Sequence, residues 1–165
     1  ASSLDCDVES QVREQPVSLN EEVEALRSVP LFAKVEPSKL KLLAFTSERL
    51  IFRAGQELFH QGDAGDAAYV ILEGHADIVV DTPNGELAVA KVGKNDLVGE
   101  IAILIDVPRT ATIRAETELT TLAITKDLFF RLISEFPDMS VEIMRELAHR
   151  LEATTAQLRE AKSAA

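Results

Sequence analysis

The spacing of apolar residues changes twice along the chain. Between residues 20 and 45, apolar side chains recur every three to four positions, a period that predicts short helices. From about residue 48 to 124 the period falls to about two, and turn-forming residues occur at short intervals, which indicates antiparallel strands. A helical period returns after residue 125. The pattern predicts a mainly β protein, an antiparallel β-roll of jelly-roll type with helices on both sides of it in the sequence.

The expected elements have recognisable boundaries. Asn20 precedes an acidic first turn and is the expected N-cap of the first helix, which Pro30 ends. A second short helix opens at residues 36–38. Asn84 and Gly85 both tolerate a positive φ and are expected to form a hairpin turn. Strands are expected at residues 48–52, 57–60, 68–72, 76–81, 87–92, 111–115 and 119–124.

A long helix is expected near the C-terminus. Thr125 is the expected cap of a preceding helix, Pro137 ends that helix, and the long helix follows from about residue 138 to 161. Apolar residues on one face of it repeat in steps of three and four, as in a coiled-coil seam. Because this stripe continues past the length that one roll could easily cover, a partner helix in a homodimer is favoured over packing on the chain's own roll. This seam consists of Met144, Leu147, Leu151, Thr154, Leu158 and Ala161.

Length and composition set limits on organisation. We expect a tail at residues 1–18, a β-roll with N-terminal and hinge helices at 19–136, and the long helix at 137–165. A single cysteine, Cys6, rules out a disulfide framework within one chain. No apolar run approaches the roughly 20 residues of a membrane span, and no signal pattern is seen, so a cytoplasmic location is expected. The formal net charge of −11 argues against direct nucleic-acid binding by this chain.

Residues 98–112 carry the candidate chemistry. Gly99 permits a tight turn, after which residues 100–104 can form a helical turn whose free amides attract an anion. Pro108 fixes the backbone before Arg109, whose planar fork matches two phosphate oxygens, and Thr110 adds a hydroxyl donor. Glu100 would repel a bare anion, so it is expected to face a hydroxyl-bearing part of the ligand. A ribose-phosphate satisfies both demands.

The string GEIAILIDVPRTAT at residues 99–112 resembles the phosphate-binding cassette of the cyclic nucleotide-binding domain family, to which catabolite activator proteins, protein kinase A regulatory subunits and cyclic nucleotide-gated channels belong. The string QGDAGDAAYVILEGHADI at residues 61–78 is similar to another patterned stretch of that family. The resemblance implies that Glu100 binds the ribose 2′-hydroxyl and Arg109 the cyclic phosphate. The backbone of Gly99, Ile101 and Ala102, with Thr110, would complete that site.

The resemblance extends to base contacts. Val89 and Val92 would line the base pocket, although plain core packing remains open. The string HRLEATTAQL at residues 149–158 resembles the helix of catabolite activator proteins that meets the adenine, which implies contact by Thr154 or Thr155. Arg150 stands where channel members place an arginine over the base. A solvated Arg150 and a Thr154 that sets helix register are the alternatives.

These features imply a non-enzymatic cyclic nucleotide sensor that needs no cofactor or metal. Its expected ligand is cAMP, with cGMP as the alternative, and binding would shift the long helix towards the cassette. A nucleotide-independent dimerisation or docking module on the same fold is the competing hypothesis. An enzyme is disfavoured because His60, His75 and His149 lack metal-site spacing. No helix-turn-helix follows the long helix before Ala165, so we expect a fragment of a larger protein or a separate partner for output.

Overall fold

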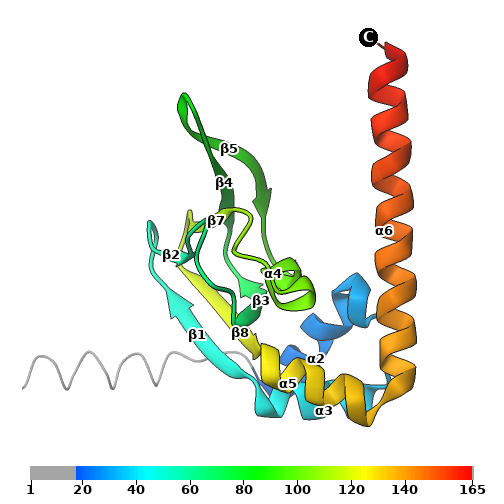
Figure 1. The fold of residues 1–165 in the computed structure, drawn as a ribbon. Coiled ribbons are helices and arrows are strands. Elements are labelled where there is room, and N and C mark those ends of the chain that lie inside the picture. The colour runs from blue at the N-terminus through cyan, green and yellow to red at the C-terminus, as the bar shows by residue number, and fades with distance from the viewer. Residues whose placement is uncertain (1–17, 165) are drawn as a thin grey trace, which may run out of the picture.

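The computed structural model describes residues 18–164, and the predicted tail lies outside them except for Ser18. The chain runs through α2 (Leu19–Ser28), η1 (Pro30–Phe32) and α3 (Pro37–Thr46) into a β-roll, and it leaves the roll through α5 (Lys126–Glu135) and α6 (Pro137–Ala164). The strands are β1 (Glu48–Phe52), β2 (Glu57–Phe59), β3 (Ala67–Glu73), β4 (Ala76–Thr82), β5 (Gly85–Val92), β6 (Leu97–Val98), β7 (Thr112–Ala115) and β8 (Leu119–Thr125). The short helix α4 (Glu100–Ile105) interrupts them (Figure 1).

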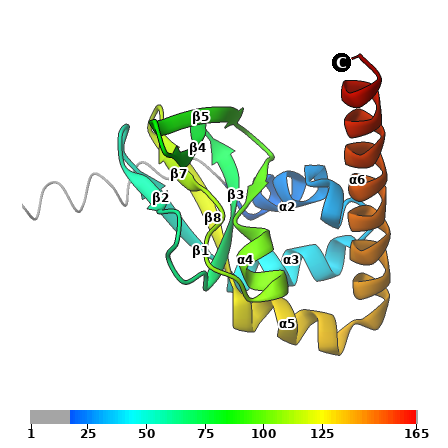
Figure 2. The ribbon, with the colours of Figure 1, turned by 45° about the horizontal axis from the view of Figure 1, so that its top comes forward.

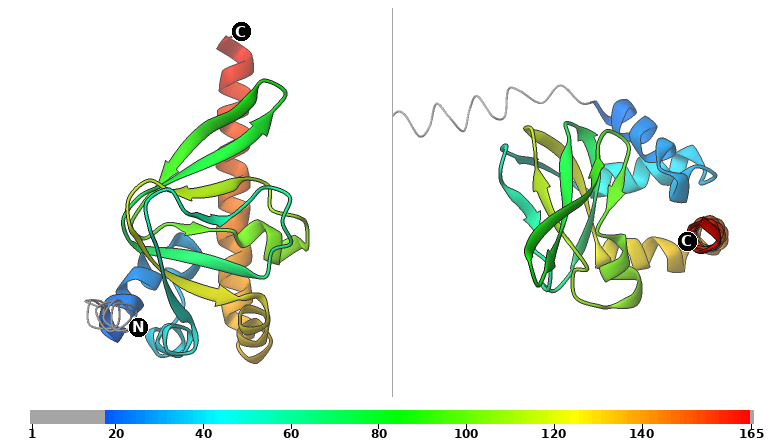
Figure 3. Two further views of the ribbon diagram at one scale, coloured as in Figure 1. Left: turned by 90° about the vertical axis from the view of Figure 1, so that its left-hand side faces the viewer. Right: turned by 90° about the horizontal axis from the view of Figure 1, so that it is seen from above.

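The strands form two antiparallel sheets that face each other. One sheet has the order β1-β8-β3-β6 and the other the order β2-β7-β4-β5. The β4–β5 hairpin projects beyond the rest of the roll, as the side view of Figure 3 shows. The predicted fold class, an antiparallel β-roll with N-terminal helices and a long C-terminal helix, is therefore confirmed.

Alternation along β3 explains how the roll and the helices share one structure. Val70 and Leu72 belong to the apolar cluster that includes the helices, whereas Ile71 belongs to the cluster inside the roll. Side chains of successive strand residues point to opposite faces, so β3 is buried on both. The helices therefore cover the outer face of this sheet and leave the roll interior on the other side (Figure 2).

The N-terminal helices are tied to the roll by an ion pair as well as by apolar packing. Glu22 of α2 is buried and pairs with Arg49 of β1. Phe32 of η1 packs against Phe129 of α5, with ring centroids 6.5 Å apart. The N-terminal helices and the hinge helix α5 thus form one apolar layer beneath the roll.

Two local expectations were wrong, and one strand was missed. Ser18, not Asn20, caps α2, because its hydroxyl accepts a hydrogen bond from the Glu21 amide at 3.3 Å. The β4–β5 turn centres on residues 83–84, since a proline there fixes φ near −65°, and only Gly85 takes the positive φ, of 109°. The two-residue strand β6 was not predicted, because two residues are too few for an alternation pattern.

Helix α6 leaves the domain after its first turns. Met139 and Ile143 are buried against the helical layer, and Leu147 is partly buried there. Every residue from 148 to 163 is exposed, and the C-terminal half stands apart from the roll (Figures 1 and 3). Within residues 18–164 no helix is both long and apolar enough to span a bilayer.

Candidate functional site

Helix α4 and the loop after it form the structural counterpart of the predicted cassette. Gly99 takes a positive φ of 84°, which turns the chain from β6 into α4. Asp106 ends the helix with a φ of 53°, and the loop returns to β7. The amides of Ile101 and Ala102 lie in the first turn of α4, where helical amides have no intrahelical acceptor. The predicted turn and short helix are both present.

Arg109 is a buried cation in this loop. Its exposed fraction is only 3%, and its guanidinium donates from Nη1 to the Gly99 carbonyl at 2.9 Å and from Nη2 to the Ala67 carbonyl at 2.7 Å. The Nε atom is buried without a hydrogen-bond partner. Burial lowers the pKa of the guanidinium, which reflects the cost of holding a cation away from water. Within residues 18–164 no carboxylate forms an ion pair with Arg109 at 4.0 Å or less.

Backbone hydrogen bonds fix Arg109 from the β2–β3 loop. The Arg109 amide donates to the Asp63 carbonyl at 2.8 Å, and the Gly62 amide donates to the Arg109 carbonyl at 2.9 Å. Gly65 of the same loop lies so close that an added Cβ would be 2.5 Å from the Ala102 Cβ and 3.2 Å from the Arg109 Cζ. Position 65 therefore has no room for a Cβ and requires glycine.

A cavity of about 180 Å³ opens in front of Arg109. Its walls come from β2, β4, β5, β6 and β7 on the roll side and from α4 and the following loop on the other. The lining is apolar apart from Glu100, Arg109 and Thr110, so one anionic and one cationic side chain face the same small space. The lining residues are Phe59, Ile78, Val92, Leu97, Val98, Gly99, Glu100, Ile101, Ala102, Arg109, Thr110, Ala111 and Ile113.

Glu100 links this cavity to the long helix. Its Oε1 accepts a hydrogen bond from Nη1 of Arg150 on α6 at 2.8 Å, and the two side chains form an ion pair. The hydroxyls of Thr154 and Thr155 donate instead to carbonyls one turn earlier on α6, each at 2.9 Å. Arg150 is therefore the residue by which the exposed part of α6 reaches the cassette.

The structure brings together most of the residues that the sequence singled out. The cavity is lined by Gly99, Glu100, Ile101, Ala102, Arg109, Thr110 and Val92. Val89 lies outside it and is 51% exposed on β5. Arg150, Thr154 and Thr155 are exposed on α6; Arg150 hydrogen-bonds to the cavity residue Glu100, whereas the two threonines hydrogen-bond within α6.

Sequence reasoning missed Phe59. The Arg109 Cζ lies 3.9 Å from the centroid of the Phe59 ring, and the ring also lines the cavity. The alternation of apolar residues in β2 marked Phe59 as a strand residue. No local pattern pairs it with a residue 50 positions later, because that contact depends on the register of β2 and β7.

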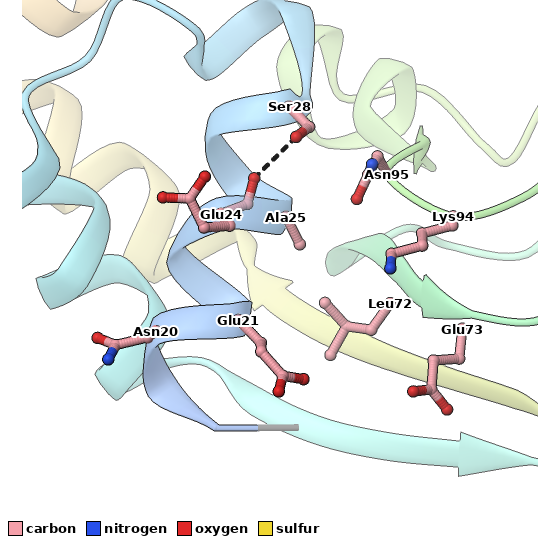
Figure 4. Close-up of a pocket in the computed structure, with 9 residues that line it drawn as sticks. All are labelled: Asn20, Glu21, Glu24, Ala25, Ser28, Leu72, Glu73, Lys94 and Asn95. Atoms are coloured by element: carbon pink, nitrogen blue, oxygen red, sulfur yellow. Dashed lines mark hydrogen bonds between the residues drawn. The ribbon is translucent and has the colours of Figure 1, made fainter. Parts of the chain in front are cut away.

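A larger cavity, of about 380 Å³, lies between α2 and the roll (Figure 4). Its charged lining residues are Glu21, Glu24 and Glu73 against a single Lys94. This excess of carboxylates disfavours an anionic ligand, and the cassette contributes nothing to it. Among residues 18–164 no group of three or more His, Cys, Asp or Glu is placed to hold a metal ion.

The fold and the cavity together define a ligand-binding β-roll that presents a buried arginine and a carboxylate. Residues 49–136 match the cyclic nucleotide-binding domain, and the chain belongs to that family. The expected resemblance is confirmed.

Three individual proteins illustrate what the chain is similar to. The CRP-like cAMP-activated global transcriptional regulator of Mycobacterium tuberculosis is 31% identical over 136 residues, which are 82% of this chain and 61% of that protein. The N-terminal domain of a transcriptional regulator from Streptomyces coelicolor A3(2) superposes with a TM-score of 0.73 at 33% identity, covering 81% of this chain and 93% of that one. Lysophospholipase nte1 of Neosartorya fischeri is 32% identical over 116 residues, 70% of this chain but 8% of the enzyme.

Proposed function

We propose that this chain is a cAMP-binding sensor domain in which the ligand occupies the cavity in front of Arg109. The observation that carries the proposal is the buried guanidinium, which donates to two carbonyls, has a buried Nε without an acceptor, and forms no ion pair in the described chain. A buried cation of this kind is compensated by an anion. A cyclic phosphate supplies two oxygens that a planar guanidinium can bind together.

Glu100 is assigned to the ribose. Its carboxylate faces the same cavity as Arg109, and a carboxylate accepts hydrogen bonds from hydroxyls while it repels phosphate. The ribose 2′-hydroxyl lies beside the cyclic phosphate in the ligand, so one nucleotide can satisfy both side chains. First-turn amides of α4 and the Thr110 hydroxyl supply further donors towards the phosphate.

The long helix is the proposed output. Arg150 of α6 donates a hydrogen bond to Glu100, the residue assigned to the ribose. A nucleotide that binds to Glu100 would compete with Arg150 for this carboxylate. If the nucleotide has a higher affinity for a second arrangement of α6, in which this ion pair is changed, its binding favours that arrangement. Contacts from Thr154 or Thr155 to the base belong to that second arrangement.

A homodimer is proposed through the exposed face of α6. Met144, Leu151 and Leu158 are each at least 59% exposed, although they repeat at the spacing of a coiled-coil seam. Exposed apolar side chains in such a stripe are typical of a surface that a partner helix covers. A nucleotide-independent docking module would use the same seam, and it remains the second candidate.

We assign no catalytic role to the chain itself. The relative that is an enzyme is about twelve times longer than the segment matched here, since the match covers 8% of it. The cavity holds no His, Cys or Ser that would act as a nucleophile or base with Glu100. Binding and repositioning of a helix are the functions that this geometry supports.

The test is a parallel calorimetric titration with cAMP, cGMP, cyclic CMP and 2′-deoxy-cAMP. We expect cAMP to bind most tightly. We expect 2′-deoxy-cAMP to bind about 1–3 kcal/mol more weakly, because it leaves the Glu100 carboxylate without its hydroxyl partner. Glu100→Ala should remove that difference between the two ligands. Absence of binding by all four nucleotides would favour the docking module instead.

A further inference from the structure

The Phe59 ring lines the cavity and packs against the guanidinium of Arg109. The Arg109 Cζ lies 3.9 Å from the ring centroid, within the range of a cation–π contact. Phe59 in turn stacks on Tyr69 of β3, with ring centroids 6.0 Å apart and ring planes inclined by 29°. Phe52 of β1 meets Tyr69 edge-on at 6.1 Å. Three strands thus support the ring on which the arginine rests.

The surroundings of the guanidinium leave it little freedom. Two carbonyls accept from its terminal nitrogens, and Gly99 lies so close that an added Cβ would be 2.6 Å from the Arg109 Nη1 and 3.1 Å from the Phe59 ring. The two carbonyls fix the direction in which the Arg109 guanidinium points, and the Phe59 ring fixes the tilt of the guanidinium plane. Bidentate recognition of phosphate needs both, because the fork is planar.

We propose that Phe59 is a positioning residue for the ligand: its ring holds the plane of the Arg109 guanidinium before binding, so that the phosphate meets a preset fork. This inference rests on the cyclic nucleotide function proposed above. Preorganisation of this kind increases affinity because less ordering remains to be done on binding. The π face of the ring also stabilises a desolvated cation that forms no ion pair with a carboxylate in the described chain.

A graded change of the ring tests the proposal. Phenylalanine analogues with one, two and three fluorine atoms are placed at position 59, which weakens the negative potential of the ring face while nearly keeping its shape. Affinity for cAMP is expected to fall stepwise with each fluorine, by about fivefold for the trifluorinated ring, and by about tenfold for Phe59→Leu. The same series at position 52 is the matched control, since Phe52 contacts Tyr69 without contacting Arg109.

A second readout needs no ligand. The Arg109 Nε proton, observed by nitrogen-edited NMR of the ligand-free protein, should carry an upfield ring-current shift that Phe59→Leu abolishes and the Phe52 series leaves in place. This signal reports the stack itself, so it separates positioning of the guanidinium from direct contact between Phe59 and the nucleotide.

The outcomes are distinct. A stepwise loss at position 59, a flat response at position 52 and a shifted Arg109 signal support the inference. A flat response at position 59, or equal losses at both positions, overturns it while cyclic nucleotide binding stands. If the wild-type chain binds no cyclic nucleotide, the proposed function fails and this inference fails with it.

Discussion

Glu100 and Arg150 form an ion pair with 2.8 Å between Oε1 and Nη1, which joins the cassette helix α4 to the long helix α6. The pair spans 50 positions in the sequence, and it links a residue of the cavity lining to the part of α6, residues 148–163, that is exposed. Any ligand that engages Glu100 therefore acts on the only hydrogen bond that we find between residues 148–163 and the roll. The relationship makes α6 the element whose position should depend on the nucleotide.

Arg150→Gln should release the C-terminal half of α6. Spin labels at Asn84→Cys on the β4–β5 turn and Gln157→Cys on α6, in a Cys6→Ser background, report the separation of helix and roll. We expect a broader distance distribution in ligand-free Arg150→Gln than in the labelled parent, with a change in unfolding free energy below about 1 kcal/mol, because half-exposed ion pairs contribute little to stability. Arg159→Gln on the same helix is the control. Identical distributions for the parent and Arg150→Gln would refute the tether.

Leu151→Gln combined with Leu158→Gln should convert a dimer into a monomer. Both side chains are exposed on one face of α6 and are expected to bury against their equivalents in the partner. Sedimentation velocity at micromolar concentration measures the change. Ala153→Gln, which lies off this face, should leave the dimer intact. A wild-type chain that sediments as a monomer with and without cAMP would speak against the seam.

Gly65→Ala should weaken both folding and cAMP binding. The added methyl would lie 2.5 Å from the Ala102 Cβ and would press on the Arg109 guanidinium, so we expect a loss of about 1–3 kcal/mol in unfolding free energy and a measurable rise in Kd. Gly62→Ala in the same loop has open space but a φ of +92°, so it adds backbone strain without crowding Arg109. Urea unfolding and calorimetry of both variants separate the two effects. Equal effects on binding would show that crowding of Arg109 is irrelevant.

His60 should give the stability of the domain a pH dependence near neutrality. A hydrogen bond to Glu57 is the main cause that raises the pKa of His60 above its ordinary value of 6.5, and the neighbouring carboxylates of Asp81 and Asp63 act in the same direction. Because the pKa of His60 is higher in the folded state than in the unfolded state, protonated His60 contributes to the free energy of unfolding. This contribution is fully present below about pH 6.5 and is lost as the pH rises through the folded-state pKa. Glu57→Gln should lower the pKa of His60, as followed by NMR of the imidazole protons. Glu73→Gln should leave it unchanged, and an unchanged His60 titration in Glu57→Gln would contradict the assignment.

Much of the architecture could be read from local patterns. The period-two alternation located seven strands, and the Gly99 turn followed from the residues around it. The alternation did not report burial, because β5 is almost wholly exposed whereas β3 is buried on both faces. The Ser18 cap was missed because the polar segment before it looked like a continuous tail, although Ser18 and Glu21 stand at capping-box spacing. The turn at Pro83 was misjudged because the adjacent Asn-Gly pair suggested another geometry.

From the residues alone, the site was predictable only where its members are neighbours in the chain, and Val92 was expected only from the family resemblance. Residues 99–102, 109 and 110 belong to the cassette and line one cavity, as their spacing indicated. The Phe59 stack and the Arg150 ion pair depend on strand register and on the path of α6, and no local pattern encodes either. Val89 was grouped with Val92 from the resemblance, but side chains three positions apart on a strand point to opposite faces, and only Val92 lines the cavity.

Calorimetric titration of cAMP into matched arginine variants tests the proposed binding of the nucleotide phosphate to Arg109. Arg109→Ala and the charge-retaining Arg109→Lys are compared with Arg114→Ala, an arginine on β7 that pairs with Glu57 and Glu86 outside the cavity. With folding verified by circular dichroism, Arg109→Ala should lose about 2–5 kcal/mol of binding free energy and Arg109→Lys somewhat less, because lysine keeps the charge but lacks the fork. Arg114→Ala should bind like the wild type. Folded Arg109 variants that bind cAMP as tightly as the wild type would show that Arg109 does not hold the phosphate.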